Sequence, residues 1–186
     1  MDHGGGGEAI LDVTPGPELP EDTDSSCTLN INDDETLLVK AEAFVFNHTA
    51  RTWTKLASQF TWRSPSTPRN WFRTACGLTF DAQGRPKHAV LAGGKTAHNH
   101  VQLLDIETRL WSDGPSLPLP SLEMASVVPY GRSFLVVGGN GQAGSQDAVF
   151  QFDPNRLEWI EREERLPAGR HGMHAVFVDE EDVSCS

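Results

Sequence analysis

Residues 133–159 read SFLVVGGNGQAGSQDAVFQFDPNRLEW: an apolar run ending in two glycines, a second apolar run, a turn of Asp, Pro and Asn, and then a tryptophan. The same series occurs upstream, where HAVLAGG (88–94) is followed by VQLLD (101–105) and Trp111. Short apolar runs separated by Gly, Pro, Asn and Asp are typical of β-strands joined by tight turns. The two stretches therefore predict two copies of one small antiparallel unit.

A constant step along the chain relates these copies to two others. Cys27, Cys76, Ala125 and His174 are spaced 49 residues apart, and each stands at the head of a short apolar run. A second fixed step, of six residues, leads from a turn residue to a tryptophan in three copies: Asn47 to Trp53, Asp105 to Trp111, and Asp153 to Trp159. Self-similarity at this period indicates a repeat architecture.

Four short strands repeated every 45 to 50 residues describe the blade of a β-propeller. A single four-stranded sheet cannot bury both faces, so the sheets stack around an axis, and we expect one indole per blade to fill the space between neighbours. The predicted fold is all-β, and its parts are an N-terminal segment (1–15) that could add one strand, blades at about 16–62, 67–113 and 114–165, the first strand of a fourth blade within 166–179, and a tail (180–186).

Over residues 16–179 the chain resembles the kelch repeat family, in which a strand ends in Gly-Gly and a tryptophan follows the third strand. In the first copy Lys40-Ala41 replaces the glycine pair. The structural residues that carry the resemblance are Gly93, Gly94, Trp111, Gly138, Gly139, Trp159 and, without its glycine pair, Trp53.

The number of repeats predicts an incomplete kelch-type β-propeller of four-stranded antiparallel blades. Propellers typically have four to eight blades, and three blades with one further strand cannot close a ring. We therefore expect a domain fragment, a partial gene product, or one part of a longer propeller.

The resemblance implies that binding takes place on loops between the second and third strands and on loops between blades. Loop 58–74 holds several Arg and Trp residues and no acid, which suits an acidic peptide, since these two residue types often anchor interfaces. Alternatively, Trp71 and Phe72 pack on their own blade while the arginines neutralise the acidic N-terminal stretch. Loops 95–99, 112–123, 140–146 and 160–172 are the other candidates, and the expected partner-binding residues are Trp62, Arg63, Arg69, Trp71, Arg73, His98, Arg170 and His171.

The leading functional prediction is a non-catalytic protein–protein interaction module that binds an unknown protein or an acidic peptide, with no cofactor. The alternative is a fragment of a kelch-fold enzyme, similar to the sialic-acid epimerases or the copper oxidases, that is inactive without its missing blades. Arg170, His171 and Glu163 are the epimerase-like candidates. An oxidase-like site would need a tyrosine ligand, and the chain has one tyrosine, Tyr130, in a predicted turn.

Histidines and cysteines are the candidates for a metal or redox site. His98 with His100, and His171 with His174, have spacings compatible with a metal, but neither pair has Cys or carboxylate neighbours in the sequence, so no metal is predicted. Cys27 and Cys76 are expected to be reduced, because stacked sheets lie about 10 Å apart and a disulfide needs Cα atoms within about 7 Å.

Charge and targeting signals narrow the remaining classes. A formal net charge of −11 argues against a nucleic-acid partner, whose phosphates require clustered Lys and Arg. The chain as given contains neither a signal peptide nor a run that could cross a membrane, so no membrane partner is expected and the compartment is unassigned. The sequon Asn47-His48-Thr49 would accept a glycan in a secreted protein.

Overall fold

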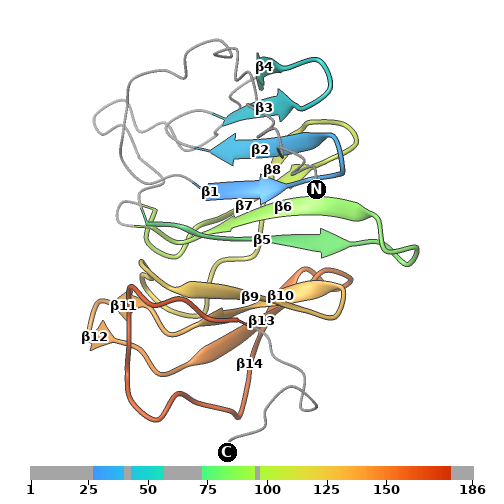
Figure 1. Ribbon diagram of the computed structural model, residues 1–186. Helices are drawn as coiled ribbons and strands as arrows, with labels where there is room; N and C mark the ends of the chain where they lie inside the picture. Colours follow the sequence, from blue (N-terminus) through green and yellow to red (C-terminus); the bar gives the residue numbers. More distant parts are fainter. Residues whose placement is uncertain (1–26, 40–42, 57–72, 95–96, 177–186) are drawn as a thin grey trace, which may run out of the picture.

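The computed structural model describes residues 27–39, 43–56, 73–94 and 97–176. These residues form three four-stranded antiparallel sheets, called here blades 1, 2 and 3, which follow one another along the chain (Figure 1). Blade 1 contains β1 (Cys27–Asn30), β2 (Glu35–Val39), β3 (Ala43–Asn47) and β4 (Thr52–Lys55). Blade 2 contains β5 (Ala75–Phe80), β6 (Pro86–Ala92), β7 (Val101–Asp105) and β8 (Trp111–Asp113). Blade 3 contains β9 (Ser126–Tyr130), β10 (Ser133–Val137), β13 (Val149–Asp153) and β14 (Glu158–Glu161), with the small hairpin β11 (Asn140–Gly141) and β12 (Gly144–Ser145) between its second and third strands.

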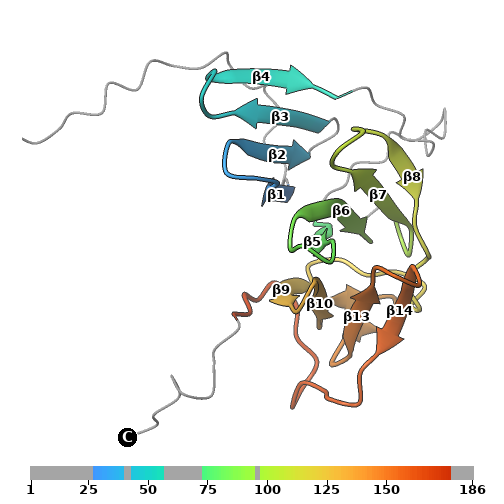
Figure 2. The ribbon, with the colours of Figure 1, turned by 90° about the vertical axis from the view of Figure 1, so that its right-hand side faces the viewer.

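The blades fan out from their first strands. β1 lies beside β5, and β5 beside β9, whereas the last strands β4, β8 and β14 diverge from one another (Figure 2). This is the arrangement of propeller blades around an axis, with each first strand innermost.

The six-residue step from turn residue to tryptophan spans the tight turn between the third and fourth strands of a blade. In blade 2 the Asp105 carboxylate accepts hydrogen bonds from the backbone N–H (2.7 Å) and hydroxyl (2.9 Å) of Thr108. Arg109, four residues after Asp105, has a φ of 61°, and this left-handed residue ends the turn. Register then places each tryptophan opposite the residue before the turn: Phe46 with Trp53, Leu104 with Trp111, and Phe152 with Trp159.

Two apolar cores lie between the blades. Leu37, Val39 and Val45 of blade 1 pack in one cluster with Leu91 and Leu104 of blade 2, and Trp111 is buried in the same cluster. The opposite face of blade 2 packs in a second cluster with blade 3, where the largest fully buried side chains are the rings of Phe134, Phe150 and Phe152. Burial of each such ring stabilises the fold by about 1.5–3 kcal/mol relative to exposure.

Two tryptophans therefore fill the spaces between blades, as the repeat predicts. Trp111 is packed toward blade 1, and Trp159 is packed toward blade 2, where its indole N–H donates to the carbonyl of Pro115 (2.9 Å). Trp53 lies on the face of blade 1 that is directed away from blade 2, against the ring of Phe46 (centroids 4.8 Å apart).

The glycine pairs let the segment that follows each blade approach the sheet. This segment is the linker, residues 114–125, after blade 2, and residues 162–176 after blade 3. The backbone N–H of Gly94 donates to the carbonyl of Leu122 (2.7 Å), and that of Gly139 donates to Arg170 (2.8 Å). A Cβ atom on Gly93 would collide with the Leu122 carbonyl oxygen, and one on Gly138 would lie 2.6 Å from the Arg170 carbonyl oxygen. Glycine at the first position of each pair thus combines a positive φ with the close approach of another backbone.

The expectation of reduced Cys27 and Cys76 is wrong: the structure joins them by a disulfide, with Cα atoms 6.1 Å apart. The expectation used the spacing of parallel stacked sheets, about 10 Å. Blades that fan from an axis are closest at their innermost strands, and both cysteines lie on innermost strands.

Residues 166–176 follow blade 3 in the way that the linker follows blade 2. Leu166, Met173 and Ala175 cover the remaining face of blade 3, over Val128, Val137 and Val149. The predicted first strand of a fourth blade lies partly outside the described residues, and no strand is assigned to 166–176. The predictions for residues 1–15 and 180–186 also lie outside them. Within the described ranges, no helix has the length and apolarity needed to cross a bilayer.

Candidate functional site

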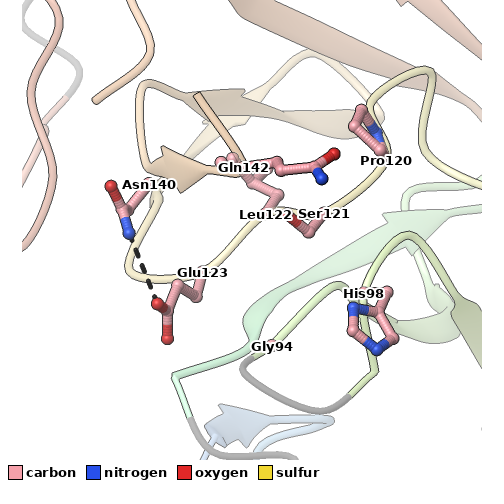
Figure 3. A pocket seen from close by; sticks show the side chains of 9 residues that line it. Gly94, His98, Pro120, Ser121, Leu122, Glu123, Asn140 and Gln142 are labelled. Carbon is pink, nitrogen blue, oxygen red and sulfur yellow. Dashed lines mark hydrogen bonds between the residues drawn. The ribbon is translucent and has the colours of Figure 1, made fainter. Parts of the chain in front are cut away.

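One end of the blade stack carries a hollow between blades 2 and 3, called here the interblade pocket (Figure 3). In blades 2 and 3 the loop from the second to the third strand and the segment that follows the last strand emerge at this end, because the four strands run antiparallel. The pocket has a volume of about 320 Å³, and its lining comes from three segments: Gly94 and His98, then Pro120, Ser121, Leu122 and Glu123, then Asn140, Gly141 and Gln142.

Backbone hydrogen bonds hold the three segments together. Leu122 accepts from the N–H of Gly94 and donates its own N–H to the carbonyl of His98 (3.2 Å). Glu123 and Asn140 exchange two backbone hydrogen bonds (2.9 and 2.7 Å), which join the linker to the β11–β12 hairpin. The walls of the pocket are thus fixed in place by the same contacts that hold blade 3 to blade 2.

Glu123 is the acidic residue of the pocket. Its Oε1 atom accepts a long hydrogen bond from the Asn140 side-chain amide (3.4 Å), which Figure 3 shows as a dashed line, and Arg73 Nη1 lies 3.7 Å from Oε2. The Oε2 atom is buried and has no hydrogen-bond partner among the described residues. The Glu123 side chain is 21% exposed, and its polar contacts with other described side chains are these two long ones.

A second hollow, of about 260 Å³, adjoins the interblade pocket. The two share Pro120, Ser121, Gly141 and Gln142, and the second adds mainly apolar or neutral residues: Leu119, Ala143 and Gln146. The pair of hollows thus forms one surface that is acidic and polar at one end and more apolar at the other.

A third hollow, of about 320 Å³, lies where the linkers enter the innermost strands. It is lined by Arg73, Thr74, Met124, Ala125, Gly172, Met173 and His174. Two backbone hydrogen bonds cross it from blade to blade: the N–H of Met124 donates to Arg73 (3.0 Å), and the N–H of Gly172 donates to Met124 (2.9 Å). Arg73, Met124 and Gly172 all have a φ between 56° and 62°, so the same turn precedes the first strands of blades 2 and 3 and recurs after blade 3.

The structure places four of the predicted partner-binding residues. His98 lines the interblade pocket, and Arg73 is ion-paired with Glu123. Arg170 and His171 are exposed on the linker after blade 3, where the His171 Nδ1 and Ser145 Oγ atoms share a hydrogen bond (2.8 Å). Trp62, Arg63, Arg69 and Trp71 lie outside the described residues, so binding through most of loop 58–74 stays a prediction.

Glu123, Asn140 and Gln142 were not singled out from the sequence. Glu123 is the acid of an otherwise apolar and small linker, but nothing in the sequence indicates that it faces the hairpin of the following blade. The Asn-Gly-Gln-Ala-Gly series at 140–144 did mark a loop, and that loop became β11 and β12.

The candidates for other chemistry are not brought together. Glu163, Arg170 and His171 are each exposed, and no hydrogen bond or ion pair links any two of them in the described structure. In the same ranges, no three His, Cys, Asp or Glu side chains are grouped as metal ligands would be. The sequon residue Asn47 donates from Nδ2 to Asp34 (2.8 Å) and accepts from the N–H of Ala50 (2.6 Å), so its side chain is part of the turn in blade 1.

Comparison with known proteins gives the fold a name. No protein-family model matches the chain. The solved structure of YjhT, a kelch-repeat β-propeller protein, is similar to it, with a TM-score of 0.59 and 16% sequence identity. The similarity covers 78% of this chain and 53% of YjhT, so the chain spans about half of that propeller. The predicted fold is confirmed: the chain is all-β, with four-stranded antiparallel blades of the kelch-propeller type.

Proposed function

We propose that this stretch of kelch-type propeller is a non-catalytic protein-binding module, and that it binds its partner on the end that carries the interblade pocket. The observation that carries the proposal is the convergence of three loop segments, from two blades and their linker, on one hollow with fixed walls.

Two physical features support binding at this end. The loops are held by backbone hydrogen bonds to the blades, so less conformational entropy is lost when a partner orders against them. Leu122 is buried in the core, but other side chains of these segments, among them Gln142 and Ala143, are exposed and can be changed without loss of packing, which is why binding residues gather on such loops.

Site-specific photocrosslinking in the cells that express the protein tests the proposal. A benzophenone amino acid replaces the exposed Gln142 at the pocket, or the exposed Gln83 in the turn at the opposite end of blade 2. We expect irradiation to give a discrete protein adduct from position 142 and none from position 83. Equal adduct patterns from the two positions, or none from position 142, would contradict binding at this end.

A further inference from the structure

The interblade pocket and the adjoining hollow together indicate the chemistry of the partner. A carboxylate can accept about four hydrogen bonds, and a buried oxygen without a donor costs free energy. Glu123 uses little of this capacity, because its side-chain contacts are the 3.4 Å hydrogen bond from Asn140 and the 3.7 Å ion pair with Arg73. Among the described residues, the Glu123 carboxylate therefore has one long hydrogen bond, at Oε1, and no hydrogen-bond donor at Oε2.

The donor that suits Glu123 best is a cationic side chain. Hydrogen bonds from arginine or lysine to a carboxylate are about twice as strong as neutral ones, and the guanidinium group can make two of them in parallel. The pocket offers further acceptors in the side chains of Asn140 and Gln142, which Figure 3 labels near Glu123.

The adjoining hollow accepts a different type of side chain. Leu119, Pro120 and Ala143 contribute to its lining, and Gln142 and Ser121 stand between it and the interblade pocket. Two adjacent hollows of different polarity match two nearby side chains of one segment, one basic and one apolar.

The net charge of the chain also favours a basic partner. The formal net charge is −11, which attracts a basic segment at long range and raises its rate of association.

We propose that the two hollows bind an extended segment of a partner protein, with an arginine or lysine side chain at Glu123 and an apolar side chain against Leu119, Pro120 and Ala143. This inference rests on the proposed function and adds the partner's chemistry to it. It differs from the acidic peptide expected for loop 58–74, most of which lies outside the described residues.

Selection from a displayed library of peptides with seven randomised positions tests the inference. The immobilised wild-type chain is expected to enrich peptides that carry Arg or Lys within a few positions of Leu, Ile, Val or Phe. Glu123→Gln should abolish the enrichment of the basic residue, and Ala143→Asp, which places a charge in the apolar hollow, should abolish that of the apolar residue. An enriched peptide, labelled and titrated by fluorescence anisotropy, should bind Glu123→Gln about tenfold or more weakly.

Glu107→Gln is the matched control, because it makes the same charge change at an exposed turn residue at the other end of blade 2. It should enrich the same peptides as the wild type, and all variants should melt as the wild type does. Selection of acidic peptides, or of basic peptides that Glu123→Gln binds equally well, overturns the inference and leaves the proposed function standing. Failure to enrich any peptide sequence counts against both.

Discussion

Cys27 and Cys76 form a disulfide between the innermost strands of blades 1 and 2, at the same position of two successive repeats. The bond closes a segment with a sequence separation of 49 residues. Loop-closure entropy for a segment of this length amounts to about 4 kcal/mol in the chain-entropy account of disulfides. The first strands of blades 1 and 2 are thus joined covalently as well as through their shared core.

Removal of this disulfide should destabilise the fold. Cys27→Ser with Cys76→Ser is expected to lower the free energy of unfolding by about 2–4 kcal/mol, measured by urea denaturation under non-reducing conditions. Cys185→Ser is the control and should unfold as the wild type does. Alkylation followed by intact-mass measurement should leave Cys27 and Cys76 unmodified until a reductant is added, and full alkylation without a reductant would show that the bond is absent.

Gly138 should resist substitution because of its surroundings as well as its φ. Gly138 and Gly131 have similar values, 62° and 57°, but an added Cβ at Gly131 meets nothing within 4 Å, whereas one at Gly138 meets the Arg170 carbonyl oxygen. Gly131→Ala is expected to cost about 1 kcal/mol through backbone strain alone, and Gly138→Ala about 2–4 kcal/mol. Equal losses in thermal or urea unfolding would mean that the linker after blade 3 does not lie against the glycine pair.

Trp159 and Ile160 provide a test of which face of β14 is packed. Trp159 contacts the rings of Phe134 and Phe152, with centroids 6.1 and 5.0 Å away, whereas Ile160 is 36% exposed on the other face. Trp159→Ala is expected to lower the free energy of unfolding by about 3–5 kcal/mol, and Ile160→Ala by less than about 1 kcal/mol. A larger loss of stability for Ile160→Ala than for Trp159→Ala would place the indole outside the space between blades 2 and 3.

Asp105 should stabilise its turn in a pH-dependent way. The hydrogen bonds from Thr108, first of all from its backbone N–H, lower the pKa of Asp105 in the folded chain. A lowered pKa in the folded state gives stability above the unfolded pKa, near 4, that is lost as the pH falls through the folded value. Asp105→Ala should therefore cost about 1 kcal/mol at pH 7, a figure that allows for solvent screening of a partly exposed group, and less below pH 4.

Asp105→Asn is the companion variant, because Asn47 occupies the equivalent position in blade 1 and accepts a turn hydrogen bond from Ala50. It should lose less stability than Asp105→Ala at pH 7. If the difference in free energy of unfolding between wild type and Asp105→Ala stayed constant from pH 7 to pH 3, that result would contradict a role for the ionised carboxylate.

The repeat could be predicted from the sequence because its features are local. The glycine pairs, the Asx turns and the tryptophans each depend on residues within one blade, so Gly93, Asp105 and Trp111 could be assigned from spacing. The disulfide could not, since it depends on how far blades 1 and 2 converge at the axis. The spacing of 49 residues along the sequence shows that Cys27 and Cys76 occupy equivalent positions of two repeats, but it does not give the distance between them in space.

The candidate site was predicted only in part for the same reason. Loops 95–99, 112–123 and 140–146 were expected to bind, and His98, Glu123, Asn140 and Gln142 of the interblade pocket fall within them. Glu123 belongs to the linker, and its place opposite Asn140 follows from the contact between blade 3 and the linker that precedes it. A partner contact by Arg73 stays a prediction; the structure shows its ion pair with Glu123, 50 residues along the chain.

Blades 2 and 3, and blade 3 and the residues that follow it, are joined by repeated backbone hydrogen bonds, and amide hydrogen exchange tests this central claim most directly. The N–H groups of Gly94, Met124, Gly139 and Gly172 lie in loops and linkers, yet each donates to a linker carbonyl. The account predicts that these four amides exchange nearly as slowly as those of the buried strand residues Val90 and Val136. Exchange as fast as that of Gly131, in an exposed turn, would show that the blades do not stack in this way.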